Sequence, residues 1–365
     1  MKIQKVEAVP FSIPYSEPLK YGLRGFLKSA DHLLIRVMTD DGITGLAEAM
    51  PRPIIYGESQ KSILWAVEHW LAPRVEGLPL YALERIWDEI EPLRGNNTAK
   101  GALDIAIHDA LGKTLGMPLY RLLGGWTDRI PVAWMVGQKA TEEAVQECVE
   151  VLEKGIRSFK VKIGIDPEKD VELIGRLRKA LGDDVTIYVD ANQAFSYDEA
   201  NRFLPIMESE GIALVEEPMP TWNTKGRLRL SQRISVPIIG DESATTPSDV
   251  EREIDLGVIS VISVKTPRTG YYQSRKIIHL AEQAGLSCII GSQADTDIGA
   301  LASAHFGSAF KVFSHPAELT FFLTMKDNLL ETPPKIEDGI LVLPEEPGLG
   351  TRVDEGKIEH YRLDK

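Results

Sequence analysis

From residue 131 onward the chain alternates between short apolar runs and helical stretches. Eight runs rich in β-branched residues begin about 21 to 30 residues apart, at 132–136, 159–163, 185–189, 213–215, 237–239, 258–264, 288–290 and 312–314. Strands that alternate with helices pair in parallel. Eight such units within 200 residues favour a closed TIM-type (β/α)8 barrel over an open doubly wound sheet, which usually has fewer strands.

Three of the stretches between these runs carry signals for the start of a helix. Asp166 precedes Pro167, and a proline is well suited to the first helical position. Ser196 is followed three residues later by Glu199, the pattern of a capping box, and Thr246 is again followed by a proline. These signals support a helix after each of the strands concerned.

The chain before residue 131 has a different organisation. We expect a strand at 3–13, two strands within 31–50 joined by an Asp-Gly turn, and helices from 59 to 122. Polar segments at 15–30 and 50–58 are expected to be loops. A further strand-like piece near 340–343 precedes a polar tail. We therefore predict an α+β capping domain formed by residues 1–125 together with a returning C-terminal segment, 326–365, around a barrel at 126–325.

The net charge of the chain limits the classes of partner that it can be expected to bind. With 54 acidic and 41 basic residues among 365, the net charge is −13. Such a surface repels nucleic acid and anionic lipid, so we expect neither as a partner. The two cysteines have no metal-binding spacing, no apolar run is long enough to span a membrane, and the N-terminus lacks the pattern of a secretory signal. The expected location is the cytoplasm.

Three carboxylates stand just after successive predicted strands. Asp190, Glu216 and Asp241 lie 26 and 25 residues apart, which is one strand–helix unit each. Barrel enzymes place their chemistry at the carboxyl ends of the strands, so the three acids should share one rim. One acid in such a place is usually a helix cap or a solvated loop residue, but three in register predict a cation site. Oxygen ligands alone favour Mg²⁺, with Mn²⁺ possible.

Lysines accompany these acids. Lys160 and Lys162 lie two residues apart on one predicted strand and so share a face, which we expect to be the inner one. Crowding of like charges should lower the pKa of one of them toward neutrality, as a general base requires. Lys265 follows the sixth run, across the barrel from the second. A single lysine is more often a surface residue, but their coincidence with the acids predicts two bases flanking a metal-bound substrate.

This arrangement predicts proton transfer at the carbon next to a substrate carboxylate. One lysine would remove or return the proton, and the cation would stabilise the charge of the resulting enolate. Bases on two faces permit racemisation, epimerisation, β-elimination or its reverse. The motifs do not choose among them.

At this point the chain resembles the enolase superfamily, in the muconate lactonizing enzyme subgroup of the mandelate racemase/muconate lactonizing enzyme family. The resemblance covers essentially the whole chain. It rests on the following motifs: Lys-x-Lys at 160–162, Asp190-Ala191-Asn192, Glu216-Glu217-Pro218, Asp241-Glu242-Ser243, Lys265 and the helix at 101–125.

The resemblance implies a role for each matching residue. Asp190, Glu216 and Asp241 would be Mg²⁺ ligands. Lys162 and Lys265 would be the acid/base pair, with Lys160 supporting Lys162. The remaining candidates would orient the metal or contact the substrate, several of them from the two loops of the capping domain: Asn192, Glu242, Gln293, Glu318, Tyr21, Phe26 and Tyr56. Simple loop packing is the alternative interpretation of the three aromatic residues. Kinship also implies a homo-oligomer and a small carboxylate substrate.

Two departures from the family bear on the activity. Mandelate racemase-type members carry a histidine after the seventh strand, where this chain has Gly291-Ser292-Gln293. Glu318 matches an acidic position of muconate cycloisomerases, but the stretch after Gln293 differs from theirs. We therefore expect a Mg²⁺-dependent isomerase, foremost a muconate-type cycloisomerase. The alternatives are an amino-acid or dipeptide epimerase, an N-acyl amino-acid racemase, an acid dehydratase, a Schiff-base aldolase that uses Lys265 or a barrel without activity.

Overall fold

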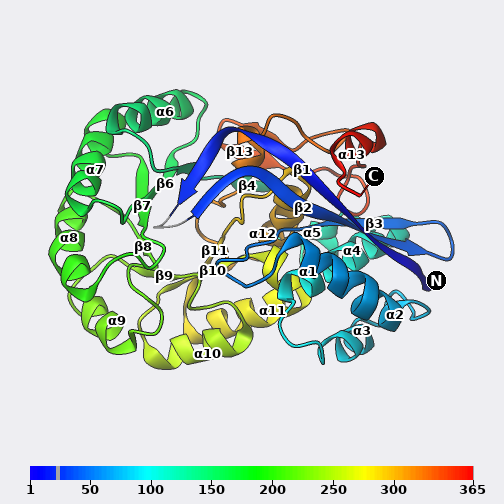
Figure 1. Cartoon of the computed structure of the whole chain (residues 1–365). Helices are drawn as coiled ribbons and strands as arrows, with labels where there is room; N and C mark the ends of the chain where they lie inside the picture. The colour runs from blue at the N-terminus through cyan, green and yellow to red at the C-terminus, as the bar shows by residue number, and fades with distance from the viewer. Residues whose placement is uncertain (22–24, 365) are drawn as a thin grey trace.

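The computed structural model describes residues 1–21 and 25–364, without the side chain of Tyr21. It divides into an N-terminal sheet with covering helices and a curved parallel sheet ringed by helices (Figure 1). The N-terminal sheet is antiparallel and consists of β1 (Ile3–Tyr21), β2 (Gly25–Thr39) and β3 (Thr44–Ala49), in that order. None of the helices in the described part is long and apolar enough to cross a membrane.

The pairing of β1 with β2 corrects the prediction of a loop for residues 15–21 and 25–30, whereas residues 22–24 lie outside the described part. Pairing continues past the body of the sheet, with Pro14 opposite Ser29 and Leu19 opposite Leu27. The strands persist because Tyr15 and Ala30 are buried, which anchors the extension on the rest of the protein. The hairpin reaches over the carboxyl ends of the parallel strands near β6 and β7 (Figure 1).

Helices cover the N-terminal sheet and connect it with the barrel. One long helix, α4 (Asn97–Leu115), is buried along most of its length and packs against β3 on one side and a barrel helix, α11 (Thr266–Ala284), on the other. The tight contact requires small residues: a Cβ on Gly45 would lie 2.0 Å from the Ala106 carbonyl oxygen. The helices before the barrel are α1 (Gln60–Ala66), a π-helical turn (Val67–Leu71), α2 (Ala72–Val75), α3 (Leu83–Ile90), α4 (Asn97–Leu115) and α5 (Leu119–Leu123).

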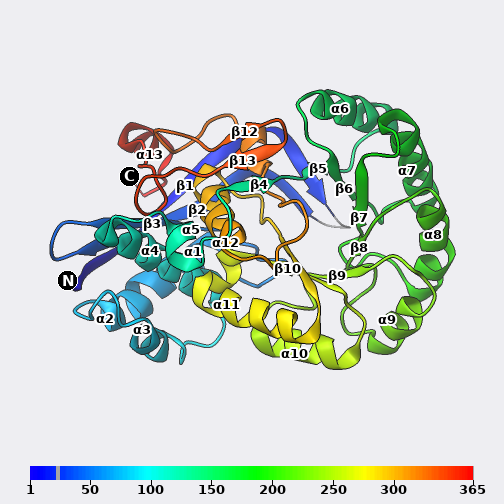
Figure 2. The ribbon, with the colours of Figure 1, turned by 180° about the vertical axis from the view of Figure 1, so that it is seen from behind.

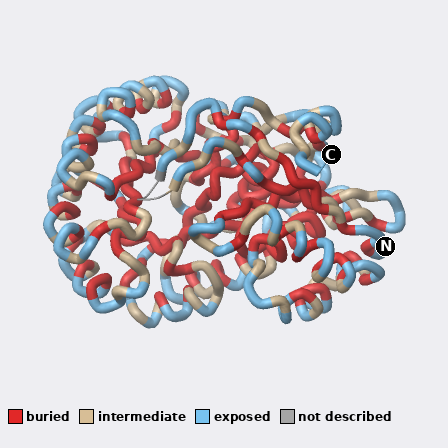
Figure 3. Tube along the Cα trace, in the orientation of Figure 1, coloured by how far each residue is buried: buried red, intermediate tan, exposed pale blue. Residues whose placement is uncertain are grey.

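Seven parallel strands form the curved sheet, paired in chain order from β5 to β11. They are β5 (Trp134–Val136), β6 (Ser158–Lys162), β7 (Thr186–Asp190), β8 (Val215–Glu216), β9 (Ile238–Gly240), β10 (Val261–Val264) and β11 (Ser287–Ile290). The helices between and after them are α6 (Thr141–Glu153), α7 (Pro167–Leu181), α8 (Tyr197–Ser209), α9 (Thr224–Ser231), α10 (Pro247–Leu256), α11 and α12 (Asp297–Ala309). The predicted barrel is thus confirmed. Helices α6 to α10 have an exposed outer side (Figure 3), whereas α12 is buried along its whole length.

The predicted helix starts are present. The Asp166 side chain accepts a hydrogen bond from the backbone of α7, and Pro167 is the first residue of that helix. Ser196 and Thr246 each form a capping box, at α8 and α10 respectively. These caps satisfy backbone N–H groups that would otherwise lack a partner, so each helix begins where its sequence signal lies.

The eighth run differs from the prediction, since 312–314 forms no strand. Phe313 bridges Cys288 on β11, and Ala317 bridges Val132 ahead of β5, so the segment still joins the two edges of the sheet. His315 and Pro316 lie between the two bridges, and a proline has no N–H to donate to a ladder. The barrel is closed by these two bridges rather than by an eighth continuous strand.

The C-terminal segment returns to the beginning of the chain. Strand β12 (Lys335–Glu337) pairs antiparallel with β13 (Ile340–Val342), and β13 pairs antiparallel with β4 (Arg129–Pro131), the piece that leads into the barrel (Figure 2). After α13 (Glu355–Tyr361), the Leu363 N–H donates to the Pro10 carbonyl oxygen of β1 at 2.8 Å. The tail therefore packs on the N-terminal sheet.

The barrel interior is filled below its carboxyl-end rim. One cluster of buried apolar side chains, contributed by six different strand segments, comprises Ala133, Tyr188, Leu214, Ile239, Val261 and Ile289. At the level of Tyr188, the neighbour on β6 is Lys160, which is also fully buried. Lys160 thus takes a position in the interior that a hydrophobic residue holds on the other strands.

Candidate active site

The three predicted carboxylates lie together at one rim of the barrel. Asp190 ends β7 and Glu216 ends β8, where the two residues are paired neighbours in register. Asp241 follows directly after β9. All three side chains are buried. The regular spacing of the strand–helix units places them side by side, as the sequence predicted.

Lysine ammonium groups lie between these acids. The Lys160 Nζ is 2.7 Å from Glu216 Oε1 and 3.0 Å from Asp190 Oδ2. The Lys162 Nζ is 2.5 Å from the same Asp190 oxygen. Lys265, directly after β10 and at the start of α11, contacts Asp241. Lys160 and Lys162 both point inward, because residues two apart on a strand share a face.

The pKa of Lys160 differs from the expectation. Burial lowers it, but the charges of Asp190, Glu216 and Glu318 outweigh burial and hold it well above its usual range. Lys160 is therefore not the member of the pair whose pKa falls toward neutrality, because its nearest charges are carboxylates. The pKa of Lys265 is likewise raised, with burial opposing and its carboxylate partner prevailing.

The pKa values of the carboxylates are driven apart. Burial would raise the pKa of Asp190, but the two lysines beside it bring it well below its usual range. The pKa of Glu216 moves the opposite way, well above its usual range, because of burial and the adjacent charge of Asp190. Its Oε2 atom is buried without a hydrogen-bond partner. Glu216 is thus a buried acid that lacks sufficient positive charge nearby.

The three rim carboxylates have the ligand chemistry that a divalent cation requires. Three carboxylates without His or Cys match the preference of Mg²⁺ and Mn²⁺ for oxygen, and the unpartnered Glu216 oxygen is available to a ligand. In the conformation described, no three His, Cys, Asp or Glu side chains of residues 1–21 and 25–364 already converge on one ion position. The Lys160 ammonium group occupies a place between Asp190 and Glu216.

A second group of polar residues connects the strand ends at the rim through hydrogen bonds. The Asn192 side chain accepts from Lys162 at 2.9 Å and donates to Glu242 at 3.2 Å. Glu217 Oε1 accepts from the backbone N–H groups of Asp241 and Ser243 at 2.7 and 2.8 Å. Burial and the neighbouring acids raise the pKa of Glu242 to about 8. Glu217 was missed as a site residue, although it stands beside Glu216 in the quoted motif.

Arg268 was also missed. Its Nη1 atom is 2.6 Å from Asp241 Oδ1 and donates to the Tyr56 hydroxyl at 3.1 Å. It thus joins the 50–58 segment to the rim. The only signal in the sequence was its place three residues after Lys265, one turn into α11.

Strained backbone is concentrated at this rim. Of the six residues other than glycine with positive φ in the described part, four follow barrel strands: Asn192, Gln193, Glu217 and Ala294. Such conformations are uncommon for residues with a side chain and persist only where the surroundings hold them. The strand ends are therefore shaped tightly around the site.

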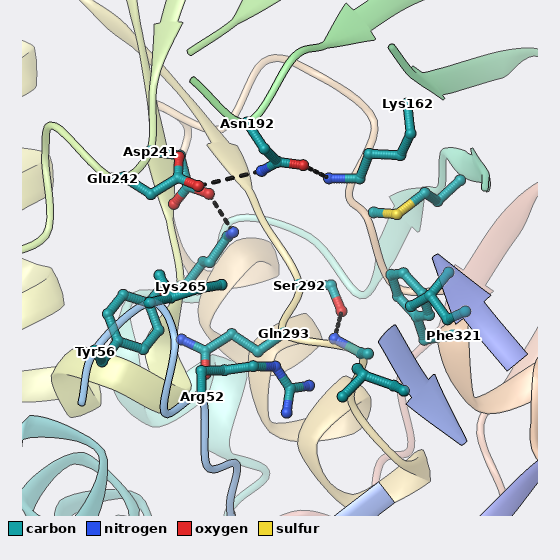
Figure 4. Close-up of a pocket in the computed structure, with 15 residues that line it drawn as sticks. Arg52, Tyr56, Lys162, Asn192, Asp241, Glu242, Lys265, Ser292, Gln293 and Phe321 are labelled. Carbon is teal, nitrogen blue, oxygen red and sulfur yellow. Dashed lines mark hydrogen bonds and ion pairs between the residues drawn. The ribbon is translucent and has the colours of Figure 1, made fainter. Parts of the chain in front are cut away.

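A cavity that is partly open to solvent lies at this rim. Seven of the predicted residues line it: Lys162, Lys265, Asp241, Asn192, Glu242, Gln293 and Tyr56. Figure 4 shows Lys162 and Lys265 on different sides of the space, with Arg52 and Gln293 below the rim acids. The lining residues that the sequence did not single out are mostly apolar: Leu19, Leu27, Arg52, Ile55, Met135, Ser292, Ala294 and Phe321.

Other predicted residues lie elsewhere. Phe26 is 49% exposed and is not among the lining residues, whereas its neighbour Leu27 is. The segment is a strand, so alternate side chains face opposite sides. The side chain of Tyr21 lies outside the described part. Glu318 is buried beneath the cavity, 2.9 Å from the Lys160 Nζ and 3.0 Å from the Tyr188 hydroxyl.

Comparisons with known proteins agree with this geometry. Residues 6–124 match the N-terminal domain model of mandelate racemase / muconate lactonizing enzymes, and residues 143–357 match the enolase C-terminal domain-like model. Muconate cycloisomerase 1 of Acinetobacter baylyi is 32% identical over 98% of this chain and 99% of its own. The L-Ala-D/L-Glu epimerase of Clostridium acetobutylicum is 29% identical over 96% of this chain and 98% of its own.

A solved structure extends the likeness to three dimensions. The muconate lactonizing enzyme of Mycobacterium smegmatis, in complex with muconolactone, superposes with a TM-score of 0.97 at 42% identity, covering both chains completely. The chain therefore belongs to the mandelate racemase / muconate lactonizing enzyme family of the enolase superfamily, and like the relatives named here it is an isomerase.

Proposed function

We propose that the chain is a Mg²⁺-dependent cycloisomerase that interconverts an unsaturated dicarboxylate of the muconate type and its lactone. The observation that carries this proposal is the placement of Lys162 and Lys265 on two sides of one cavity whose rim holds Asp190, Glu216 and Asp241. Enzymes of this superfamily pair a Lys or His base with Mg²⁺. The relatives with known structures include muconate lactonizing enzymes.

In the proposed reaction, a lysine transfers one proton to or from a carbon atom of the substrate. In the lactone-forming direction, one carboxylate oxygen of the substrate adds to the conjugated chain, and Lys162 or Lys265 delivers a proton to the carbon next to the other carboxylate. In reverse, the same lysine removes that proton and the ring C–O bond breaks. Bound Mg²⁺, held by Asp190, Glu216 and Asp241, supplies positive charge for the carboxylate beside which the enolate charge develops.

The polar residues around the lysines support this role. Lys162 is held by Asp190 and Asn192, so its Nζ has a fixed position at the cavity wall. Lys160 contacts Glu216 and Glu318 below the cavity and is not among the lining residues. We therefore assign proton transfer to Lys162 and Lys265 and a positioning role to Lys160.

The walls suit a hydrocarbon chain. The apolar lining residues come from the β1–β2 hairpin, from the 50–58 segment, from β5 and from the segment after residue 318: Leu19, Leu27, Ile55, Met135 and Phe321. An apolar wall excludes water from an enolate and strengthens the electrostatic contacts at the rim. These properties favour the carbon skeleton of an unsaturated acid over a polar sugar acid.

A second candidate is epimerisation of a dipeptide or another amino-acid derivative. Two bases on opposite sides also fit removal and return of a proton on opposite faces of one carbon. The L-Ala-D/L-Glu epimerase of Bacillus subtilis superposes with a TM-score of 0.93 at 30% identity. The same lysines and acids would serve this reaction, so the substrate decides between the two.

The test is turnover with Mg²⁺ present. We expect the purified protein to consume cis,cis-muconate, seen as loss of the ultraviolet absorbance of the diene, and to form muconolactone by NMR. Turnover of L-Ala-L-Glu but not of muconate would favour the epimerase. A protein that is trapped on a keto substrate by borohydride and is indifferent to EDTA would instead be a Schiff-base aldolase using Lys265. We further expect a homo-oligomer that acts in the cytoplasm, which sedimentation and fractionation would test.

A further inference from the structure

Arg52 is a buried cation at the cavity wall without an ion-pair partner. It is only 5% exposed, and none of the ion pairs within the described part of the chain includes it. Its Nη1 donates to the Pro51 carbonyl oxygen at 2.6 Å and lies 3.4 Å from His32 Nε2. Its Nη2 is buried and donates no hydrogen bond. A buried guanidinium with a spare donor is costly unless an anion completes its surroundings.

The groups around Arg52 do not supply that anion in full. Tyr15 interacts with it through a side-chain hydrogen bond as well as charge. Glu48 and Asp295 interact with it through their charges, but neither acid is close enough for an ion pair. Burial raises the pKa of Glu48 and of Asp295 to about 7 each, which is the reverse of what a close guanidinium would do. Burial and the charge of Arg52 lower the pKa of His32 well below its usual range, so this ring adds no counter-charge for Arg52.

Gln293 provides a second set of unused polar atoms at the same cavity. Its side chain is 5% exposed, lines the cavity, and has both Oε1 and Nε2 buried without a partner. Ser292 also lines the cavity, and its hydroxyl oxygen accepts from the Ala294 N–H at 3.1 Å, which leaves its proton free to donate. Figure 4 shows Gln293 and Ser292 between Arg52 and the rim residues Asn192 and Lys162.

The cavity therefore has two polar ends joined by apolar walls. We infer that Arg52, assisted by the Gln293 amide, binds a second carboxylate of the substrate, at the end of the cavity away from Asp190 and Lys162. This inference rests on the proposed function and assigns the residues that would distinguish a dicarboxylate from a monocarboxylate. A guanidinium suits that task, because its planar donors match a carboxylate. It would also repel the ammonium group of an unblocked dipeptide.

The test compares the binding of adipate, which has two carboxylates, with that of hexanoate, which has one. Calorimetry on the Mg²⁺-loaded protein should give a dissociation constant about 10- to 100-fold lower for adipate, the range expected for a hydrogen-bonded charge. Arg52→Met should remove most of that preference and leave hexanoate binding unchanged. Arg74→Met is the matched control, since its guanidinium stacks on Trp70 outside the cavity.

Other outcomes separate this inference from the proposed function. An unchanged preference in Arg52→Met, or none in the wild type, overturns the Arg52 subsite even if muconate is lactonised. A preference that depends on Arg52 in a protein that does not lactonise muconate supports the subsite and overturns the proposed reaction. If Arg52→Met does not fold, Gln293→Leu should lower the adipate preference to a smaller extent, and an unchanged preference there contradicts the inference.

Discussion

Lys162 and Lys265 line the same cavity although three strands, β7, β8 and β9, separate their own strands in the sheet. The Nζ of Lys162 contacts Asp190, and that of Lys265 contacts Asp241, so each amine is held by a carboxylate from a different strand. A molecule in the cavity therefore meets a proton donor or acceptor on each of two sides. This relationship underlies the proposed chemistry.

Removal of either amine should stop turnover. In Lys162→Ala or Lys265→Ala the substrate still binds, but proton transfer loses its partner, and we expect kcat to fall by at least about 10²–10⁴-fold. One of the two variants should still exchange a substrate proton with solvent, since the other lysine remains. Steady-state rates and NMR exchange measure both effects. The exposed Lys179, changed to alanine, is the control, and near-normal rates in both site variants would remove the lysines from the mechanism.

Glu216→Gln should uncouple metal binding from folding. Burial and the charge of Asp190 raise the pKa of the Glu216 carboxyl group, so the folded state gains little from ionising it. Replacing this group by a neutral amide should therefore not lower the midpoint of unfolding. Loss of a carboxylate ligand should weaken Mg²⁺ binding by at least about 10-fold, as measured by calorimetry, and abolish turnover. Glu172→Gln, on the exposed face of α7, should change neither quantity. Normal Mg²⁺ affinity in Glu216→Gln would exclude this glutamate as a ligand.

The parts of the fold set by local periodicity could be predicted, and the parts set by contacts between distant segments could not. The register of Asp190 and Glu216 follows from equal strand–helix units, which the sequence displays. The extension of β1 over 15–21 and of β2 over 25–30 depends on burial of Tyr15 by other segments, and the sequence there looks like a polar loop. Once that segment is a strand, Leu27 faces the cavity and Phe26 does not.

The positions of the polar side chains around the site also depend on contacts between distant segments and could not be predicted from the local sequence. Arg52 lies in a segment that the sequence marked only through its aromatic Tyr56, because nothing local indicates which side chain turns inward. Glu318 was predicted to contact substrate, but it lies under the cavity beside Lys160, at a depth that only the closed barrel defines. The pKa of Lys160 likewise depends on acids from three other segments.

Glu48 should make stability depend on pH. It accepts hydrogen bonds from the Thr296 and Gly299 N–H groups at the start of α12, at 3.1 and 2.9 Å, and thus ties the N-terminal sheet to the barrel. Burial raises its pKa from 4.5 to about 7. The folded state therefore prefers the protonated acid, and its contribution to stability is present below pH 4.5 and lost as the pH rises through about 7.

Glu48→Gln should remove this dependence, because an amide does not titrate and can donate to the neutral His32 ring. Between pH 5 and pH 8 the variant should gain stability relative to the wild type, by up to about 3 kcal/mol. Urea unfolding at both pH values measures the difference. A gap between variant and wild type that is the same at both pH values would contradict this assignment.

The buried ion pair between Arg227 on α9 and Glu253 on α10 should matter for stability and not for catalysis. Two parallel hydrogen bonds of 2.9 and 2.8 Å join them, and neither residue lines the cavity. Glu253→Gln leaves a buried guanidinium without its carboxylate, so we expect a loss of about 3–5 kcal/mol by denaturant unfolding. At temperatures where the variant is folded, kcat should stay within about twofold of the wild type, and a large fall would place Glu253 in the catalytic machinery.

The most direct test of the central claim is deuterium exchange at the carbon next to the substrate carboxylate. Muconolactone would be incubated with the Mg²⁺-loaded protein in D2O and followed by NMR. We predict that the proton at that carbon is replaced by deuterium, and that EDTA or the combined Lys162→Ala and Lys265→Ala changes abolish the replacement. Exchange that survives both treatments, or turnover of muconate into lactone without deuterium at that carbon, would contradict proton transfer by these two lysines.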